Sequence, residues 1–405
     1  MPPDNTCEKS SLPLAGVTVV DLTAVVFGPY GTQILADLGA TVLKVESPQG
    51  DSTRQIGPGH EPGMGGVFMN LNRGKKGVVL DLKREAARDA LLRLCETADV
   101  FVHSMRPAAI ARLGLAYEAV AARNPAIVYC NCWGFGRGGP DAGKAAYDDI
   151  IQAAAGLVSL NDETVGEAFY TPTAIADKVA GLTLAYAVLA ALLRRAGSGR
   201  GAEVEIPMFE AMSSFMLAEH ASGALFDPPL GRAVYERQTS RSRRPFRTRD
   251  GCLAIMVYND KQWSALLDLL GRPDLKADPA FATMAGRLSN MDRANGFLAQ
   301  AFAQRTTASW LELLEAASIP AVPIRTTDDL FEDPHLASVG FFQVSRDRDM
   351  GLLRHPGLPV QFDRQRVPVR SRAPRLGEHT IEVLAAAGLG DRDIQEATGS
   401  EPPRP

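Results

Sequence analysis

The sequence predicts a large doubly wound, Rossmann-like α/β domain and a smaller α/β domain, joined by two long linkers. Three observations lead to this prediction. The chain has 405 residues, which is too many for one ordinary hydrophobic core. Short apolar strands alternate with amphipathic helices in the N-terminal part of the chain. A second, shorter set of strands and helices follows a stretch rich in arginine and proline.

The first strand–helix–strand unit lies near the N-terminus. Residues 16–22 have the apolar pattern of a buried strand, residues 30–38 that of a helix ending at Gly39, and residues 40–46 that of a second strand. Strands joined by a helix lie parallel, because the crossover returns the chain to the same edge of the sheet. The pattern recurs and predicts alternating helix and strand up to about Glu205, with strands at 77–82, 100–103 and 126–133 and helices at 85–97 and 109–123.

The C-terminal part of the chain predicts the smaller domain. A helix is predicted at 207–219. Residues 223–249 are irregular and are interpreted as a linker or an extended connection between the domains. The residues from Thr327 onward are again irregular. The smaller unit has a strand at 252–258, helices from about Asp260, Arg293 and Ser309, the last with capping-box spacing, and a closing strand at 321–324. The predicted order is a large domain (1–212), a linker (213–249), the small domain (250–326), a linker (327–372) and a return to the large domain (373–405).

Composition argues against several classes of protein. The formal net charge is −4, whereas a general nucleic-acid binder normally carries a basic excess. The N-terminus lacks the charged-then-apolar pattern of a signal peptide, and the longest apolar run, 185–193, is too short to span a membrane. We therefore expect a cytoplasmic protein without a nucleic-acid or membrane partner.

Cysteine and histidine show no disulfide or metal pattern. The five cysteines are an odd number in a large chain, which is typical of reduced thiols; they are at positions 7, 95, 130, 132 and 252. The six histidines lack metal-type spacing, and most are expected at the surface or at an interface; they are at positions 60, 103, 220, 335, 355 and 379. We predict no metal site and no permanently bound cofactor.

A glycine-rich segment follows the strand at 126–133. Residues 134–139 match G-x-G-x-x-G, but the turn-forming Pro140 comes next, where a dinucleotide fingerprint needs a helix to begin. The run from Gly138 to Lys144 approaches a phosphate-binding loop, yet Ala145 stands where a hydroxyl should bind magnesium. We interpret this segment as a flexible loop at the carboxyl end of a strand, where α/β sheets bind ligands.

One acidic residue among small and apolar residues marks a candidate site. Asp177 precedes a long apolar helix that extends to Arg195. Aspartate is a preferred N-cap, and this segment alone favours a simple cap. The alternative is a nucleophile: a carboxylate with a pKa near 4 is ionised without a general base, and backbone N–H groups at a helix start can stabilise developing negative charge.

Short motifs along nearly the whole chain resemble those of the class III CoA-transferases, the family of formyl-CoA transferase and carnitine CoA-transferase. They occur in the family's order: 14–16 with 19–22, Gly28-Pro29, 35–40 with 44–46, Gly50-Asp51 with Arg54, 72–76 with 80–83, 112–115, 134–136, Asp250-Gly251, Gln262-Trp263, Asp333-Pro334 and 373–379. The resemblance implies that acyl-CoA and carboxylic acids are substrates. It also implies an interlocked homodimer, in which each chain threads the other through its two linkers.

The resemblance assigns catalytic roles to two residues. It makes Asp177 the nucleophile, which forms an acyl anhydride and then an enzyme-bound CoA thioester, and Tyr147 a hydrogen-bond donor beside the reacting acyl group. The related α-methylacyl-CoA racemases carry a catalytic histidine where Tyr147 stands, and a tyrosine with a pKa near 10 cannot replace it as an acid/base at neutral pH. Racemase activity and non-catalytic acyl-CoA binding are the alternatives.

The resemblance also indicates residues that contact CoA. Lys75 and Arg112 match CoA-binding positions, and Ser104-Met105-Arg106 replaces the family's asparagine-phenylalanine-arginine. Gly136, in the glycine-rich loop, completes the predicted set.

A segment in the second part of the chain departs from the family pattern. Residues 237–249 contain six arginines where formate-specific members have a glycine-rich loop. The sequence favours the interpretation that this segment is a solvated linker. The alternative is a cationic wall that binds the second carboxylate of a dicarboxylic acid substrate.

Overall fold

The computed structural model describes residues 12–399, which form two compact units. Within this range, unit 1 comprises residues 12–155, 171–215 and 335–399, and unit 2 comprises residues 156–170 and 216–334. Cys7 lies outside the described residues. The chain re-enters unit 1 at His335, earlier than the predicted return at residue 373, because residues 342–356 form part of unit 1.

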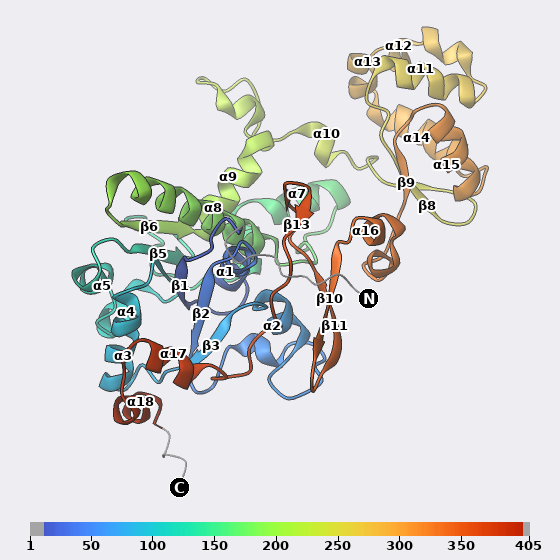
Figure 1. Cartoon of the computed structure of the whole chain (residues 1–405). Coiled ribbons are helices and arrows are strands. Elements are labelled where there is room, and N and C mark those ends of the chain that lie inside the picture. The colour runs from blue at the N-terminus through green and yellow to red at the C-terminus, as the bar shows by residue number, and fades with distance from the viewer. Residues whose placement is uncertain (1–11, 400–405) are drawn as a thin grey trace. The chain divides into compact units, whose positions relative to one another are not determined.

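Unit 1 is built on a six-stranded parallel sheet (Figure 1). The strand order β3-β2-β1-β4-β5-β6 reverses direction between β1 and β4, which is the doubly wound arrangement that the sequence predicts. The central strands β4 and β5 are buried along their whole length, which explains their nearly continuous apolar sequences. The strands are β1 (Thr18–Leu22), β2 (Thr41–Glu46), β3 (Lys76–Val79), β4 (Val100–His103), β5 (Val128–Trp133) and β6 (Ala202–Pro207).

Helices at both ends of the sheet complete the core of unit 1. Near β3, α17 packs on the strand and α18 packs on α3, so the C-terminal residues close a cluster containing Leu91, Leu384 and Ile394. At the other end, α8 lies along β6 (Figure 1). The helices of unit 1 are α1 (Phe27–Asp37), α2 (Gly66–Leu71), α3 (Glu85–Cys95), α4 (Pro107–Arg112), α5 (Tyr117–Arg123), α6 (Asp148–Ala154), α8 (Ile175–Ser198), α16 (Pro334–Ser338, from its second residue), α17 (Thr380–Ala386) and α18 (Asp391–Thr398), with α9 (Met208–His220) leaving the unit.

Close packing against α1 fixes the position of α8. A Cβ atom at Gly181 would lie 2.8 Å from the carbonyl oxygen of Phe27, and one at Gly31 would lie 2.8 Å from the carbonyl oxygen of Gly181. Glycine at both positions therefore lets the two helices approach closely. By length and composition α8 could cross a membrane, but core helices pass the same test, and its packing on α1 favours a core helix.

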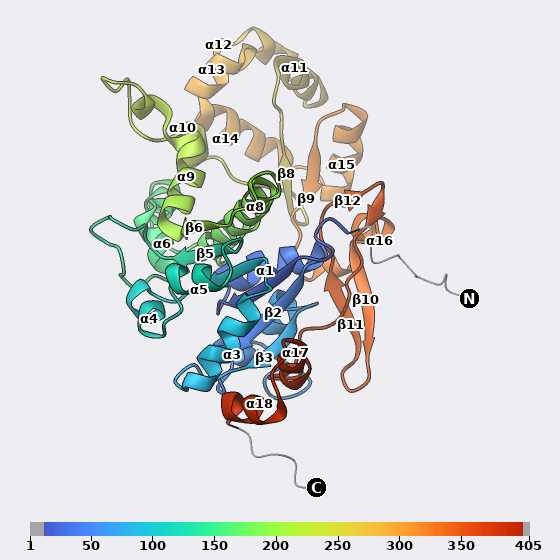
Figure 2. The same ribbon diagram turned by 60° about the vertical axis from the view of Figure 1, so that its left-hand side comes forward.

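Two segments differ from the predicted secondary structure. The alternation of strand and helix does not continue to Glu205, because α6, α7 (Leu157–Val165) and α8 follow one another between β5 and β6. The segment 327–372 is not wholly irregular, since β10 (Phe342–Asp347) and β11 (Gly351–Pro356) form an antiparallel hairpin (Figure 2), followed by the short pair β12 (Gln361–Phe362) and β13 (Gln365–Arg366). Short runs with few apolar residues carry too weak a periodicity to reveal these elements.

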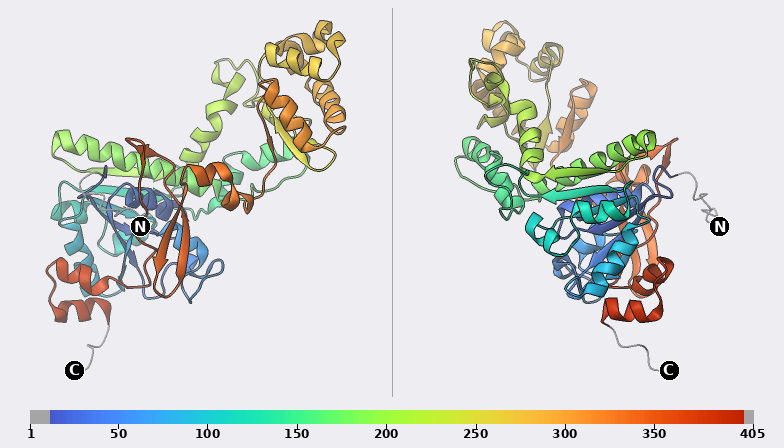
Figure 3. Two further views of the ribbon diagram at one scale, coloured as in Figure 1. Left: turned by 45° about the vertical axis from the view of Figure 1, so that its right-hand side comes forward. Right: turned by 90° about the vertical axis from the view of Figure 1, so that its left-hand side faces the viewer.

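Unit 2 is a small α/β unit with its own core. Its antiparallel sheet has the order β7-β8-β9, and helices lie beside this sheet (Figure 3). The core cluster of the unit contains Trp263, Phe302 and Trp310. The predicted capping box at Ser309 is wrong, because Thr306 caps α15 and receives the Ser309 N–H. The further elements are α10 (Glu236–Thr239), β7 (Phe246–Arg247), β8 (Cys252–Ile255), α11 (Asp260–Leu269), α12 (Pro279–Ala282), α13 (Met284–Ser289), α14 (Met291–Phe302), α15 (Thr307–Ala316) and β9 (Ala321–Pro323).

Candidate active site

A pocket of about 470 Å³ lies at the carboxyl edge of the sheet in unit 1. Residues that follow four neighbouring strands line it: Ala24 after β1, Ser47 after β2, Leu82 after β3 and Met105 after β4. The β1 and β4 ends meet at the switch point of the strand order, where the Ala24 N–H donates to the Ser104 hydroxyl at 3.3 Å. Open α/β sheets bind ligands at this edge.

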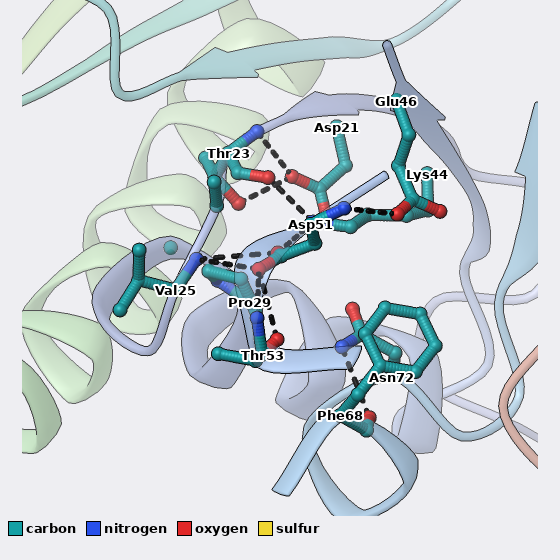
Figure 4. A network of polar contacts seen from close by, with 12 residues as sticks. Asp21, Thr23, Val25, Pro29, Lys44, Glu46, Asp51, Thr53, Phe68 and Asn72 are labelled. Atoms are coloured by element: carbon teal, nitrogen blue, oxygen red, sulfur yellow. Dashed lines mark hydrogen bonds and ion pairs between the residues drawn. The ribbon is translucent and has the colours of Figure 1, made fainter. Parts of the chain in front are cut away.

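A buried ion network holds the loop after β1 beside this pocket (Figure 4). The Lys44 ammonium donates to the Thr23 carbonyl at 2.5 Å and pairs with Asp51 at 3.0 Å. Asp51 in turn accepts the Val25 N–H at 3.2 Å. Val25 has a φ of 70°, a left-handed conformation that is strained for a β-branched residue. The network therefore stabilises a backbone shape that this loop would otherwise avoid.

Lys75 belongs to the same buried region and does not reach the pocket. Its side chain is buried, and its ammonium contacts four oxygens: Asp21 at 3.1 Å, Pro29 O at 3.1 Å, Thr32 Oγ1 at 2.8 Å and Asn72 Oδ1 at 2.9 Å. Burial lowers the pKa of Lys75 to about 8, despite the opposing charge of Asp21. In this structure the charge of Lys75 serves a structural ion pair, and its contact with CoA stays a prediction.

Asp21, the partner of Lys75 in this ion pair, is also buried in the core. Burial alone would raise the pKa of Asp21, but Lys75, Lys44 and two hydroxyl groups lower it to about 2. The lowered pKa shows that the ionised form is well stabilised in the folded chain.

A second pocket, of about 660 Å³, lies beside the first. Arg106, Arg112, Trp133 and Phe135 line it, and Arg112 lines the first pocket as well. Arg106 and Arg112 are exposed, and within residues 12–399 neither forms an ion pair. These guanidinium groups can therefore receive an anion without breaking a bond inside the protein.

The other residues that were predicted to contact CoA differ in whether their polar groups are free to bind a ligand. Met105 lines the first pocket, and Ser104 uses its hydroxyl to join the ends of β1 and β4. The Gly136 N–H donates to Glu210 at 2.9 Å, so this amide is not free to bind a phosphate. The predicted CoA contact of Gly136 would have to use another part of this residue, and it stays a prediction.

Asp177 lies in the first turn of α8 but does not cap it. The helix begins at Ile175 after Ala174, and the Ala176 and Asp177 N–H groups donate to Asp148 at 2.7 and 3.1 Å. Asp148 thus caps α8 from α6, a neighbouring helix. The N-cap interpretation of Asp177 is wrong, and within the described residues its own carboxylate has no hydrogen-bond partner or ion pair.

The surroundings of Asp177 favour its neutral form. The side chain is part-buried, and burial is the main cause that raises its pKa to about 7, with the nearby negative charge of Asp148 adding to the shift. The expectation of an ordinary pKa near 4 is corrected accordingly. At neutral pH, Asp177 divides between its ionised and protonated forms.

The N–H groups at the start of α8 are already occupied. Asp148 takes two of them, and the Ile175 N–H donates to the Thr173 carbonyl at 2.7 Å. The expectation that these groups stabilise developing negative charge in a reaction is therefore contradicted. Tyr147 precedes Asp148 and is 67% exposed, so its hydroxyl is available for a ligand.

Two residues that sequence reasoning missed hold this arrangement together. Gln152 donates to the Asp148 carboxylate at 2.6 Å, and its side-chain oxygen accepts the Thr171 N–H at 2.9 Å. Asp148 and Gln152 therefore connect α6 to the segment before α8. The four-residue spacing of Asp148 and Gln152 on one helix is visible in the sequence. The cap is not, because Ala176, whose N–H donates to Asp148, lies 28 positions later in the chain.

Histidine and metal chemistry are not evident at this site. Within residues 12–399, no group of three or more His, Cys, Asp or Glu side chains could hold a metal ion. His103, His220 and His355 are buried, so the expectation of mostly surface or interface histidines is wrong for these three. Burial lowers the pKa of His103 to about 4, and its ring bonds the Asn131 side chain at 2.9 Å.

Comparison with known proteins gives consistent matches over most of the chain. Residues 14–380 match the model of CoA-transferase family III. The probable fatty acyl-CoA transferase Rv3272 of Mycobacterium tuberculosis is 34% identical, over 92% of this chain and 98% of the relative. The mouse succinyl-CoA:glutarate CoA-transferase is 30% identical, over 94% and 88%. A crystal structure of a CAIB/BAIF family protein from Brucella suis is 31% identical, covers 93% of this chain and 99% of that chain, and superimposes with a TM-score of 0.80.

The raised pKa of Asp177 predicts a pH-dependent stability difference. Because the pKa is about 7 in the folded protein and 3.8 without the fold, ionisation between these values destabilises the folded state. Asp177→Asn should therefore become more stable than wild type as the pH rises from about 4 to about 7, and the gain should then stay constant. We expect a gain of about 1 to 2 kcal/mol, less than the full shift implies because the group is part-exposed. Urea unfolding of both proteins at several pH values measures it; a difference independent of pH would contradict the raised pKa.

Proposed function

This chain belongs to CoA-transferase family III, and on that premise we propose that it moves CoA from an acyl-CoA to a carboxylic acid through covalent intermediates on Asp177. One observation carries the proposal: Asp177 is a part-buried carboxylate that no described residue binds, although it lies at the start of a helix where carboxylates usually serve as caps. A carboxylate kept free of internal bonds is available to attack a substrate.

The proposed reaction proceeds in two balanced halves. The Asp177 carboxylate attacks the thioester carbonyl, the C–S bond breaks, and CoA leaves as a thiolate from a mixed anhydride. The thiolate then attacks the aspartyl carbonyl and releases the donor acid, which leaves a CoA thioester on Asp177. The acceptor carboxylate attacks this thioester and again expels the thiolate. Attack of the thiolate on the acceptor's carbonyl forms the new acyl-CoA and restores Asp177.

The surroundings of Asp177 suit these steps. Anhydrides hydrolyse, and the burial that raises the pKa of Asp177 also limits the access of water. The N–H groups of α8 are occupied by Asp148, so the negative charge that develops on the substrate needs another donor. We assign this role to the Tyr147 hydroxyl. A tyrosine at this position also disfavours racemase chemistry, which needs an acid/base that titrates near neutral pH.

We place the nucleotide part of CoA in the two pockets at the carboxyl edge of the sheet. CoA carries a 3′-phosphate and a pyrophosphate, and the unpaired guanidinium groups of Arg106 and Arg112 suit such anions. Lys83, which sequence reasoning missed, adds a cation to the first pocket, and Met105 adds an apolar surface. Both pockets lie within unit 1.

Removal of the Asp177 carboxylate tests the nucleophile. We expect Asp177→Ala to lose CoA transfer by at least about a thousandfold while it still binds CoA, because the covalent route needs this carboxylate. Succinyl-CoA with a panel of carboxylic acids, followed by mass spectrometry of the CoA esters and of the peptide containing Asp177, reports both turnover and adduct. Asp89→Ala, at an exposed carboxylate on α3, is the control. Turnover that survives in Asp177→Ala would exclude the proposed role.

Removal of the cation shared by the two pockets tests the CoA site. Arg112→Gln should weaken CoA binding about tenfold, since a charged hydrogen bond to phosphate is lost. Isothermal titration calorimetry of the full chain with CoA measures this effect. Arg392→Gln, at an exposed arginine on α18, should bind CoA as wild type does. Equal affinity in all three proteins would place the nucleotide elsewhere.

We also propose a homodimer, because one face of α8 exposes apolar side chains at helical spacing. Leu182 is 50% exposed, Tyr186 62% and Leu193 77%. An apolar stripe of this kind is typical of a surface that another chain covers. Sedimentation equilibrium should give the mass of two chains for wild type, and Leu193→Glu with Tyr186→Lys should shift the protein toward one chain. A single-chain mass for wild type would contradict the dimer.

A further inference from the structure

Unit 2 contains a cavity of its own, with a volume of about 430 Å³. It is bounded by β7 and β8, by α11, α13 and α14, and by the arginine-rich segment before β7. Its volume falls within the range of small-molecule sites. Nothing in the proposed chemistry on Asp177 accounts for it.

The wall of this cavity is largely apolar and deformable. Met256, Met284 and Met291 contribute three unbranched thioether side chains, and Leu298 and Trp263 belong to the core cluster of unit 2. Methionine adapts to ligands of irregular shape and is common at surfaces that bind hydrocarbon. The wall therefore suits an apolar body rather than a sugar or a nucleotide.

Three cations accompany this apolar wall. Arg237, Arg243 and Arg244 line the cavity, and within residues 12–399 none of them pairs with a carboxylate. Arg287 also lines the cavity but is paired with Asp260 at 2.6 Å. Unpaired guanidinium groups beside an apolar wall are a recognition set for a carboxylate.

A buried donor without an acceptor gives an independent indication of a ligand. Trp263 is only 4% exposed, and its indole N–H is one of the few buried polar groups in the described chain that have no hydrogen-bond partner. Buried donors are almost always satisfied by protein, water or ligand, because an unmet N–H destabilises the fold. Trp263 lines this cavity, so an acceptor bound there could complete its hydrogen bonding.

From these observations we propose that the cavity of unit 2 binds a carboxylic acid with an apolar chain. The carboxylate pairs with Arg237, Arg243 and Arg244, and the hydrocarbon lies among the methionines. A short dicarboxylate does not suit this cavity, because it would leave the apolar wall uncovered. The site goes beyond the Asp177 chemistry, since it is defined by residues of unit 2 alone.

The cavity also divides the arginine-rich segment into two parts. Arg237, Arg243 and Arg244 line the cavity, whereas the other three arginines, at 241, 247 and 249, do not. A solvated linker would give no reason for this division. The division also supplies a matched control: neutralising two arginines that line the cavity should affect ligand binding, whereas neutralising two that do not line it should have no effect.

Binding to the full-length Asp177→Ala protein, without CoA, tests the site independently of catalysis. Isothermal titration calorimetry with octanoate should show saturable binding. Octanamide, which has the same chain without the charge, and glutarate, which has two charges on a short chain, should each bind at least about tenfold more weakly. Arg243→Gln with Arg244→Gln should weaken octanoate binding at least about tenfold, whereas Arg247→Gln with Arg249→Gln should leave it unchanged.

Specific results would overturn the proposal. No octanoate binding would exclude the site, and equal binding of octanamide would exclude recognition of the carboxylate. Tighter binding of glutarate would exclude the apolar class of ligand. Equal losses in the two double variants would exclude the cavity as the location. Because these measurements need no turnover, a failure of the proposed transfer on Asp177 leaves their outcome unaffected.

Discussion

The candidate site depends on one interaction: the Asp148 carboxylate caps α8 and thereby leaves Asp177 free. Two N–H groups at the start of α8 need an acceptor, and an aspartate within the first turn would normally compete for that role. Since Asp148 reaches them from α6, the carboxylate of Asp177 has no partner among residues 12–399. The same residue brings a negative charge near Asp177, which adds to the effect of burial on its pKa. Asp148 thus leaves the proposed nucleophile free, and it contributes, after burial, to the raised pKa of that nucleophile.

Packing in unit 1 connects this cap to the carboxyl edge of the sheet. Gly31 and Gly181 let α1 and α8 approach closely, and α1 begins directly after the loop that the Lys44–Asp51 pair holds in a strained shape. Breaking a buried ion pair by removing one partner leaves an uncompensated charge and typically costs about 3 to 5 kcal/mol. The fold therefore places its charged groups where they fix the backbone around the site, and the buried Lys75–Asp21 pair is one of these contacts.

The sequence predicted those features that depend on local pattern. Five of the six parallel strands follow from apolar runs separated by helices, and Met105 and Arg112 lie beside a pocket because they follow β4 at the switch point. The sixth, β6, was not predicted, because polar and apolar residues alternate along it. Features that depend on distant partners were missed. Asp148 is 28 and 29 residues from the two N–H groups whose hydrogen bonds it accepts, Lys75 is 54 residues from Asp21, and the Gly136 amide is 74 residues from Glu210. Each of these side chains or amides is satisfied by a group that sequence spacing does not bring near it.

The raised pKa of Asp177 also bears on the direction of the proposed reaction. A more basic carboxylate is a stronger nucleophile once ionised, and a pKa near neutral keeps a substantial fraction ionised at working pH. In the mixed anhydride, the thiolate can attack either carbonyl, and the carboxylate of lower pKa is the better leaving group. An ordinary substrate acid, with a pKa near 4, leaves more readily than Asp177, so attack on the aspartyl carbonyl is favoured and the CoA passes to the enzyme. The burial that raises the pKa of Asp177 thus favours the enzyme-bound CoA thioester in the first half of the proposed reaction. It opposes the last step, in which Asp177 must leave from the acceptor anhydride.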